Sequence, residues 1–258
     1  MDDARRSRSH GPAIRPVSWP QRSFLGSLPD APLGALLALG TQREFAANAS
    51  MIVTGDDCTD VMVLIDGWAK VVAAAGEGGQ ALLALRFGGD LLGEQSALEN
   101  EPRSVTVVSA GPAVVRVVGR GPFLRFLMDW PEAGIAVSRA LSAKLRWATS
   151  RRIDFGGLPV IARLGRVLVE LAERDGRPLH GRVELGCTLT QPELAAMIGA
   201  SEPSVHKALR QLRGDGVIET GYRRIVITDE TALAAVASPG QAWPGDAVPT
   251  GRARLAAV

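Results

Sequence analysis

Cysteine is scarce in this sequence of 258 residues, which contains only 2, Cys58 and Cys187. They lie far apart and form no CxxC pair, which argues against a disulfide framework, a zinc knuckle or a four-cysteine iron–sulfur cluster. No apolar run approaches the ~20 residues that a membrane span needs. Residues 1–16 contain arginines but no apolar segment after them, so we expect no secretory signal and a cytoplasmic protein.

A large excess of charge of one sign is also missing, because 29 basic residues face 27 acidic ones and the formal net charge is +2. Any nucleic-acid-binding face must therefore be local. Apolar residues, in contrast, make up 46% of a chain longer than one usual core, so we expect two domains. Residues 1–22 and 236–258 are rich in arginine, serine, proline or glycine, and we expect both to be disordered.

Residues 23–130 alternate short apolar runs with glycine-bearing turns. A helical segment, Leu33–Leu39, comes first. The runs predicted as strands are residues 51–55, 61–75, 80–87, 103–110 and 113–118. Strands of this length at roughly ten-residue intervals are typical of a β-sandwich or jelly roll, with another β-rich topology as the alternative.

The hydrophobic period changes at Pro131 and then advances in alternating steps of four and three residues, which is the spacing of an a/d seam. The seam consists of Gly134, Ser138, Leu141, Leu145, Ala148 and Arg152. We interpret residues 131–153 as a helix that pairs with its copy in a homodimer; a helix lying on the sandwich is the alternative. Residues 154–158, DFGGL, predict a hinge.

Residues 159–235 predict a winged helix-turn-helix. Thr190 and Glu193 form a capping box, Gly199 ends that helix, and Ser201 caps a second one. The stretches VIET, GYRR and IVIT then form a hairpin. Two short helices around a tight turn, followed by a β-hairpin, constitute this module.

The second helix of the module has a polar face. Its members are Glu202, Ser204, His206, Lys207, Arg210 and Arg213. With Arg223 and Arg224 of the hairpin turn, five basic residues face two acidic ones between residues 204 and 224. This surplus lies where the phosphates of double-stranded DNA would be. The alternative is a solvated face on a small-ligand sensor whose winged helix binds protein.

Residues 24–228 resemble the Crp/Fnr superfamily of bacterial transcription regulators. The stretch GASEPSVHKALRQLRGDGVI looks like the turn and recognition helix of that family. The stretch GEQSALENEPRS is similar to the phosphate-binding cassette of cyclic-nucleotide-binding domains. The resemblance implies an α+β protein with a cyclic-nucleotide-binding-like β jelly roll, a long dimerisation helix and a C-terminal winged helix-turn-helix. It also implies a homodimer that regulates transcription on double-stranded DNA, with RNA polymerase as a further partner.

The same resemblance assigns roles within the cassette. Glu94 would accept a hydrogen bond from a ribose hydroxyl, while Arg103 and Ser104 would bind a cyclic phosphate. Gly93 would allow close backbone approach, and the amides of the short turn between these residues would add donors. An ordinary polar loop, with Arg103 paired to Glu94 as a structural ion pair, is the alternative.

The effector implied is cyclic AMP or another cyclic nucleotide. Thr149 or Ser150 on the dimer helix would read the adenine. Redox or haem sensing is poorly supported, because suitable cysteines are missing and the 3 histidines lie outside the sandwich. We find no metal-ligand cluster, GxSxG, P-loop or Cys–His pair, so we expect no enzyme.

The recognition helix departs from the family pattern directly after its capping serine. Relatives often carry an arginine and a glutamate there, whereas this chain has Glu202 and Pro203. Glu202 would accept from a cytosine amino group, Lys207 would reach guanine, and His206 is a third candidate reader. The residues assigned to phosphates are Gln191, Ser201, Ser204, Arg210 and Arg223.

Overall fold

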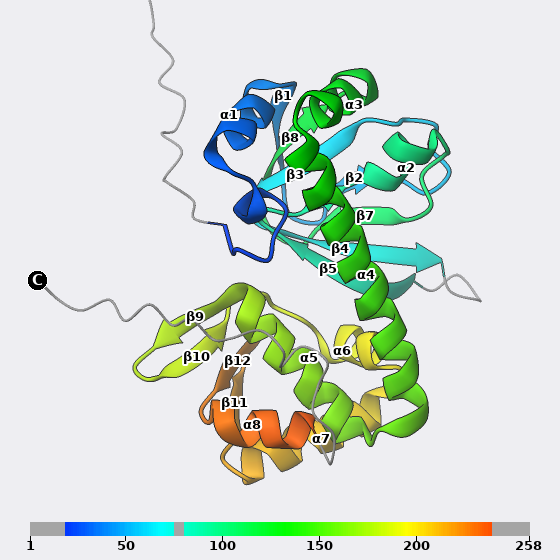
Figure 1. The fold of residues 1–258 in the computed structure, drawn as a ribbon. Helices are drawn as coiled ribbons and strands as arrows, with labels where there is room; N and C mark the ends of the chain where they lie inside the picture. The colour runs from blue at the N-terminus through cyan, green and yellow to red at the C-terminus, as the bar shows by residue number, and fades with distance from the viewer. Residues whose placement is uncertain (1–18, 75–79, 239–258) are drawn as a thin grey trace, which may run out of the picture. The chain divides into compact units, whose positions relative to one another are not determined.

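The computed structural model describes residues 19–74 and 80–238 (Figure 1). These residues form two compact units, the first made of residues 19–71 and 85–141. The second is made of residues 72–74, 80–84 and 142–238. Within the described part, no helix is long and apolar enough to cross a membrane.

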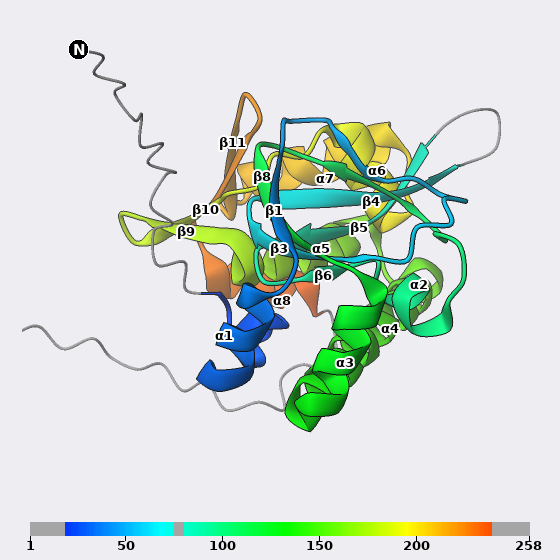
Figure 2. The ribbon, with the colours of Figure 1, turned by 90° about the horizontal axis from the view of Figure 1, so that it is seen from above.

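The N-terminal half holds two four-stranded sheets, which agrees with the predicted β-rich domain. Their strand orders are β1-β8-β3-β6 and β2-β7-β4-β5. The elements are η1 (Leu25–Ser27), α1 (Asp30–Ala38), β1 (Thr41–Phe45), β2 (Ser50–Ile52), β3 (Val61–Asp66), β4 (Trp68–Ala74), β5 (Gln80–Phe87), β6 (Leu91–Leu92), α2 (Glu94–Glu99), β7 (Thr106–Ser109), β8 (Ala113–Val118) and α3 (Arg120–Asp129). Strands β1, β8 and β3 lie side by side and antiparallel (Figure 2).

The core of the first unit joins β3 to the helices. Val61, Val63 and Phe123 are fully buried in one cluster, which also takes in the first turns of α4 (Pro131–Gly157). Trp19 packs against this cluster and donates its Nε1–H to the carbonyl of Ile65 at 2.9 Å. The predicted disordered tail is therefore wrong at Trp19, because its indole is anchored; residues 1–18 lie outside the described chain.

Helix α4 begins at Pro131, as predicted, and continues through residues that the sequence assigned to a hinge. The hinge prediction for residues 154–158 is wrong for 154–157, which are helical; only Leu158 and Pro159 interrupt the path to α5 (Val160–Asp175). The physical reason is long-range: Asp154 is buried and ion-paired to α5, which holds the last turn in helical form.

Four residues of the seam predicted on α4 are exposed, namely Ser138, Leu145, Ala148 and Arg152, whereas Gly134 and Leu141 are half-buried. Leu141 is half-buried against the core, whereas Leu145 is 69% exposed. The exposed residues that follow three- and four-residue steps are Ile135, Ser138, Ser142, Leu145, Thr149 and Arg152, with Ile153 beside them. The apolar members of this exposed face are thus Ile135, Leu145 and Ile153.

The second unit combines helices with one four-stranded sheet, in the order β11-β12-β10-β9. Its further elements are β9 (Gly176–Leu179), β10 (Arg182–Leu185), α6 (Gln191–Ile198), α7 (Glu202–Gly214), β11 (Ile218–Gly221), β12 (Arg224–Ile227) and α8 (Glu230–Ala237). The sequence did not predict the β9–β10 hairpin or α8. Helix α8 crosses α5 closely, since a Cβ on Gly165 would lie 3.3 Å from the Ala237 backbone.

Candidate functional site

The predicted cassette lies between β6 and β7. Gly93 follows β6 in the left-handed conformation, with φ of 74°, and Asn100 ends α2 with φ of 59°. The segment between Glu94 and Arg103 was expected to be a short turn, but it begins with the six-residue helix α2. The left-handed residues at both ends of α2 return the chain sharply, which brings Arg103 back to Gly93.

Arg103 is the centre of this arrangement, and only 4% of it is exposed. Its Nη1 donates to the Gly93 carbonyl at 3.0 Å. Its Nη2 donates to the carbonyl and the Oδ1 of Asp60, at 2.7 Å and 2.6 Å. A guanidinium has five N–H donors, so these three bonds fix its plane and leave two donors that they do not use.

Asp60 is the acidic partner that sequence reasoning missed. The structure gives Arg103 an ion pair with Asp60 instead of the Glu94 pair weighed above. The two residues are 43 positions apart, so no local spacing reveals the contact. The only signal was the acidic run GDDCTD, which ends at Asp60 and lies beside the cassette because Arg103 N donates to the Asp56 carbonyl.

Gly93 is required by this geometry for two reasons. Its positive φ disfavours any residue with a Cβ. In addition, a Cβ at Gly93 would lie 2.1 Å from Nη1 of Arg103, which is far inside van der Waals contact. The predicted close approach at Gly93 is therefore an approach to the arginine side chain.

The other cassette residues differ in exposure. Glu94 is buried at 3% exposure, and Ser104 is exposed. Cys58 is exposed as well, and its thiol donates to Oδ1 of Asp60, at 2.8 Å. Thr149 and Ser150 belong to the part of α4 in the second unit, where Thr149 is exposed and Ser150 half-buried.

The helix-turn-helix is built by the caps that the sequence predicted. Thr190 and Glu193 form the capping box of α6, with Thr190 N donating to Oε2 of Glu193 at 2.8 Å. Ser201 caps α7 and accepts from Ser204 N at 3.4 Å. Arg163 of α5 donates to the Ile198 carbonyl at the end of α6, at 2.7 Å. A cation at the carboxyl end of a helix interacts favourably with its dipole.

Helix α7 buries one face and exposes the opposite one. Val205, Ala208, Leu209 and Leu212 are buried, which fixes the rotation of the helix on its core. The side chains of Glu202, His206, Lys207 and Arg210 are exposed, as are Gln191 and Ser201 on the neighbouring turns. Within the described chain, neither Glu202 nor Lys207 has an ion-pair partner.

Two pairs of residues on and beside this face have local contacts. Nη2 of Arg210 lies 3.5 Å from Nδ1 of His206, a long contact between residues one turn apart. The hydroxyls of Ser201 and Ser204 lie 2.9 Å apart and are both part of the helix cap. Ser204 is half-buried, so its predicted contact with a phosphate is less direct than that expected for the exposed Ser201.

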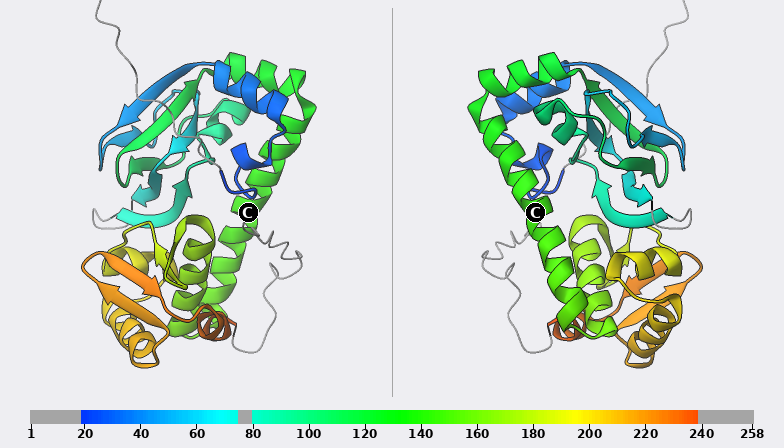
Figure 3. Two further views of the ribbon diagram at one scale, coloured as in Figure 1. Left: turned by 90° about the vertical axis from the view of Figure 1, so that its left-hand side faces the viewer. Right: turned by 90° about the vertical axis from the view of Figure 1, so that its right-hand side faces the viewer.

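The wing is the hairpin of β11 and β12, which follows α7 (Figure 3). Both wing strands are ion-paired to β10: Arg224 of β12 pairs with Glu184 at 2.6 Å, and Glu219 of β11 pairs with Arg182 at 2.7 Å. One pair neutralises an arginine of the wing and the other a glutamate of the wing, so the basic surplus counted from the sequence is unchanged. Arg223, at the tip, is exposed.

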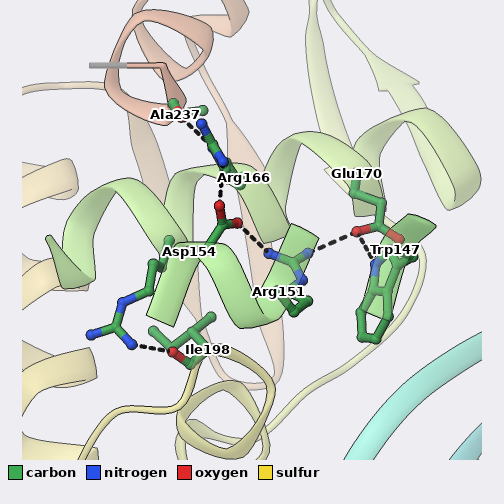
Figure 4. Close-up of polar contacts among 8 residues, drawn as sticks. Trp147, Arg151, Asp154, Arg166, Glu170, Ile198 and Ala237 are labelled. Atoms are coloured by element: carbon green, nitrogen blue, oxygen red, sulfur yellow. Dashed lines mark hydrogen bonds and ion pairs between the residues drawn. The ribbon is translucent and has the colours of Figure 1, made fainter. Parts of the chain in front are cut away.

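A buried ion-pair network joins the end of α4 to α5 and α8 (Figure 4). Asp154 is 1% exposed and pairs with Arg166, whose Nε donates to the Ala237 carbonyl at 2.8 Å. Arg151 lies 3.9 Å from Oδ2 of Asp154 and donates to Oε2 of Glu170 at 2.8 Å. The same Oε2 accepts from Nε1 of Trp147 at 2.6 Å.

Family models match both units of the chain. A model described as "Cyclic nucleotide-binding domain" matches residues 42–129, and one described as "Crp-like helix-turn-helix domain" matches residues 162–236. Among the described residues, there is no group of three or more histidine, cysteine, aspartate or glutamate side chains that could hold a metal ion.

Individual proteins similar to this chain are transcription regulators as well. The chain is 26% identical over 211 residues to a "CRP-like cAMP-activated global transcriptional regulator" of Mycobacterium tuberculosis, covering 82% of this chain and 94% of that one. It is 30% identical over 193 residues to the transcriptional regulator LdrP of Thermus thermophilus, covering 74% and 94%. A crystal structure of a CRP-family regulator, also from Thermus thermophilus, aligns with a TM-score of 0.64 and 27% identity, covering 76% and 96%.

These relatives are transcription regulators, which agrees with the expectation that the chain is not an enzyme. The likeness spans both units and nearly the full length of each relative. The chain therefore belongs to the Crp/Fnr superfamily of transcription regulators.

Proposed function

We propose that this regulator is a homodimer that binds specific DNA sequences through α7 and responds to an anionic effector, a cyclic nucleotide, at Arg103. The observation that carries the DNA-binding role is the exposed polar face of α7. Its opposite face is fixed by buried Val205, Leu209 and Leu212. A helix held in this way presents the same side chains to the major groove at every encounter.

Lys207 and Glu202 are the proposed base readers, with His206 as the third. Both charged groups are exposed, and within the described chain neither is neutralised by an ion pair. Lysine suits the acceptors O6 and N7 of guanine, and glutamate suits the amino group of cytosine. Gln191, Ser201, Ser204 and Arg210 are proposed to contact phosphates, which set the position of the helix.

Binding to DNA recovered by selecting genomic fragments with the full chain tests this role. Lys207→Ala should weaken binding to the selected duplex by about 1–3 kcal/mol, and binding to random duplex by less. Arg125→Ala is the control, because Arg125 is an exposed cation on α3 in the other unit. An equal loss on selected and random duplex would reassign Lys207 to the backbone. Failure of the unmodified chain to bind any duplex would favour a winged helix that binds protein.

The dimer is proposed to form through the exposed face of α4. Ile135, Leu145 and Ile153 expose 53%, 69% and 68% of their surface, which is costly in water for three large apolar residues on one helix. Two such helices side by side would bury these residues against each other in a two-stranded coiled coil. Two winged helices would then reach successive major grooves about one helical turn apart. Contact with RNA polymerase remains a proposal drawn from the family alone.

The effector site is proposed at the two guanidinium N–H groups that Asp60 and Gly93 do not occupy. A guanidinium already fixed by three hydrogen bonds loses little side-chain entropy when an anion binds. Ser104, exposed and next in the chain, would add a hydroxyl, and Glu94 would accept from the sugar. Thr149 or Ser150 is proposed to read the base. The activation of the mycobacterial relative by cyclic AMP makes that nucleotide the first one to test.

Calorimetric titration with cyclic AMP and cyclic GMP tests the effector. Ser104→Ala should weaken binding without loss of folding, since this side chain is exposed. Arg103→Lys should abolish it, because lysine keeps the charge but loses the planar fork. Absence of heat with the unmodified chain at high concentration would remove the cyclic nucleotide from the proposal and leave the DNA-binding role intact.

A further inference from the structure

The tip of the wing carries two side chains that the fold of the second unit does not use. Gly221 of β11 pairs with Arg224 of β12, so Tyr222 and Arg223 form a two-residue loop. Tyr222 is 93% exposed and is the one tyrosine of the sequence. Arg223 is exposed, and among the described residues it has no hydrogen-bond or ion-pair partner.

Arg223 also adopts a backbone conformation that disfavours an arginine. Its φ is 53°, in the left-handed region that glycine and asparagine occupy most readily. The neighbouring hairpin of the same sheet shows the common solution, because its loop is His180–Gly181 with glycine at the second position. A strained conformation at an exposed residue with no stabilising contact is a reason to look for a function.

The charge on the wing is concentrated at this tip. Arg224 on wing strand β12 and Glu219 on wing strand β11 are each ion-paired to β10, with Glu184 at 2.6 Å and Arg182 at 2.7 Å. The charge of Arg223 lacks such a pair in the described chain. An exposed aromatic ring beside an unneutralised guanidinium matches a narrow, negatively charged groove with apolar sugar walls, and the minor groove of A·T-rich DNA is such a groove.

The tip is held at a fixed position relative to α7. Arg213, near the end of α7, donates to Oγ1 of Thr220 in β11 at 3.1 Å. Thr228, just after β12, donates its hydroxyl to the Gly216 carbonyl at 2.6 Å. A strand of four residues spans about 13 Å. A tip at that distance from the base of the wing would reach the DNA beside the groove that α7 occupies.

We propose that Tyr222 and Arg223 insert into the minor groove that flanks each α7 site and read its width, so that the regulator prefers A·T-rich flanks. This inference rests on the proposed DNA-binding function of α7. It makes Arg223 a specificity residue at positions that α7 does not touch, instead of a contact to phosphate alone. The 2-amino group of guanine, which projects into the minor groove, would obstruct the tip.

The test uses the full chain and duplexes that share one selected core and differ only in their flanks. The flanks are A·T pairs, G·C pairs, or inosine·cytosine pairs, which keep the major-groove pattern of G·C but lack the minor-groove amino group. Fluorescence anisotropy gives the three affinities. We expect A·T and inosine·cytosine flanks to be bound about tenfold more tightly than G·C flanks, the loss typical of a mismatched position.

Two glycine variants separate the contact from effects on folding. Arg223→Gly relieves the positive φ and removes the side chain, so it should fold well and lose the preference for flanks. His180→Gly makes the same backbone change in the other hairpin and should retain the preference. Tyr222→Ala should reduce it.

Three results would overturn the inference while leaving DNA binding by α7 in place. They are equal affinities for all three flanks, inosine·cytosine behaving as G·C does, and an equal loss on every duplex for Arg223→Gly, which would indicate a phosphate contact. Failure of the unmodified chain to bind any of the duplexes would instead refute the proposed function.

Discussion

Removal of the Asp154 carboxylate should destabilise the second unit more than most single substitutions. Asp154 is 1% exposed and lies between the guanidinium groups of Arg166 and Arg151. Without it, Arg166 loses its buried carboxylate partner on α4, and the positive charge stays in the interior. Loss of one partner of a buried ion pair costs about 3–5 kcal/mol. Whole domains are stable by only about 5–15 kcal/mol, so this loss is a large share.

Urea unfolding of Asp154→Ala, followed by circular dichroism and tryptophan fluorescence, measures the effect. With a denaturant dependence of about 2 kcal/mol per molar urea, a loss of about 4 kcal/mol lowers the midpoint by about 2 M. Fluorescence should report it directly, because Trp147 donates to Glu170 within the same network. The control is Glu170→Gln. The Glu170 side chain is 30% exposed, and the glutamine that replaces it still has an oxygen that can accept from Trp147. We therefore expect the free energy of unfolding to fall by only about 1 kcal/mol.

A double substitution distinguishes a buried-charge penalty from a simple cavity. Asp154→Leu combined with Arg166→Met removes both charges and retains apolar volume, which is often neutral or stabilising for buried pairs. The double variant should therefore recover most of the stability lost by Asp154→Ala. A midpoint for Asp154→Ala within about 0.3 M of the unmodified chain would refute the reasoning, since it would mean that water reaches Arg166 freely.

Three other predictions concern single positions. Cys58 should react rapidly with a thiol reagent and Cys187 only after denaturation, because Cys58 is exposed and Cys187 buried; a native chain in which both react at once contradicts the fold of the second unit. Leu145→Asp should dissociate the proposed dimer in sedimentation experiments, whereas Ala143→Asp, on an exposed face away from Leu145, should not. If both variants are monomeric, or both remain dimeric, the proposed surface is wrong. Gly93→Ala should destabilise the first unit by at least about 1–2 kcal/mol from its positive φ alone, seen as a lower thermal midpoint, and an unchanged midpoint would mean that the β6–α2 junction can rearrange.

The helix-turn-helix was predictable because its signals are local. Thr190 and Glu193, three residues apart, form the capping box that the sequence indicates, and Ser201 caps α7 as expected. Gly199 ends α6 in the left-handed conformation. Each of these features depends on residues within one helical turn, so single-sequence reasoning can find it.

The missed elements lack such local signals. Strand β1 is TQREF, in which four residues are exposed, so no apolar alternation marks it; its pairing with β8 defines it. Strand β9 contains Pro178, which disfavours a strand assignment from sequence. Helix α3 begins RGP, which indicates a turn, and is held by buried Phe123 and Phe126.

In the candidate site too, the sequence identified the residues that belong to a local motif and missed the residue that only the fold brings close. The sequence identified Arg103 and Gly93 through the family resemblance, but Asp60 comes from a different strand connection and became visible only in the folded chain. In the seam predicted for α4, Ser138, Leu145, Ala148 and Arg152 are exposed, whereas Gly134 and Leu141 are half-buried for a related reason. Leu141 packs on the core of its own unit, and that contact sets the rotation of the helix.

The ion-pair network also determines where the winged helix can turn against α4. A rotation at Leu158–Pro159 would have to separate Asp154 from Arg166, at a cost of several kcal/mol. Coupling between an effector and a second site typically supplies only about 1–3 kcal/mol. An effector of ordinary strength therefore leaves this junction closed, and the last turns of α4 move with α5 as one body.

Paired spin labels can measure whether this junction opens. Ala143→Cys on α4, away from the proposed dimer face, and Gln211→Cys on α7 place labels at exposed positions, in a chain whose Cys58 is replaced by serine. The distance distribution should be the same with and without cyclic AMP, even if DNA affinity changes. A broadened or shifted distribution would show that the network opens, and the hinge predicted from DFGGL would then act after all. Because the network buries both charged partners, that opening should also become easier in Asp154→Ala.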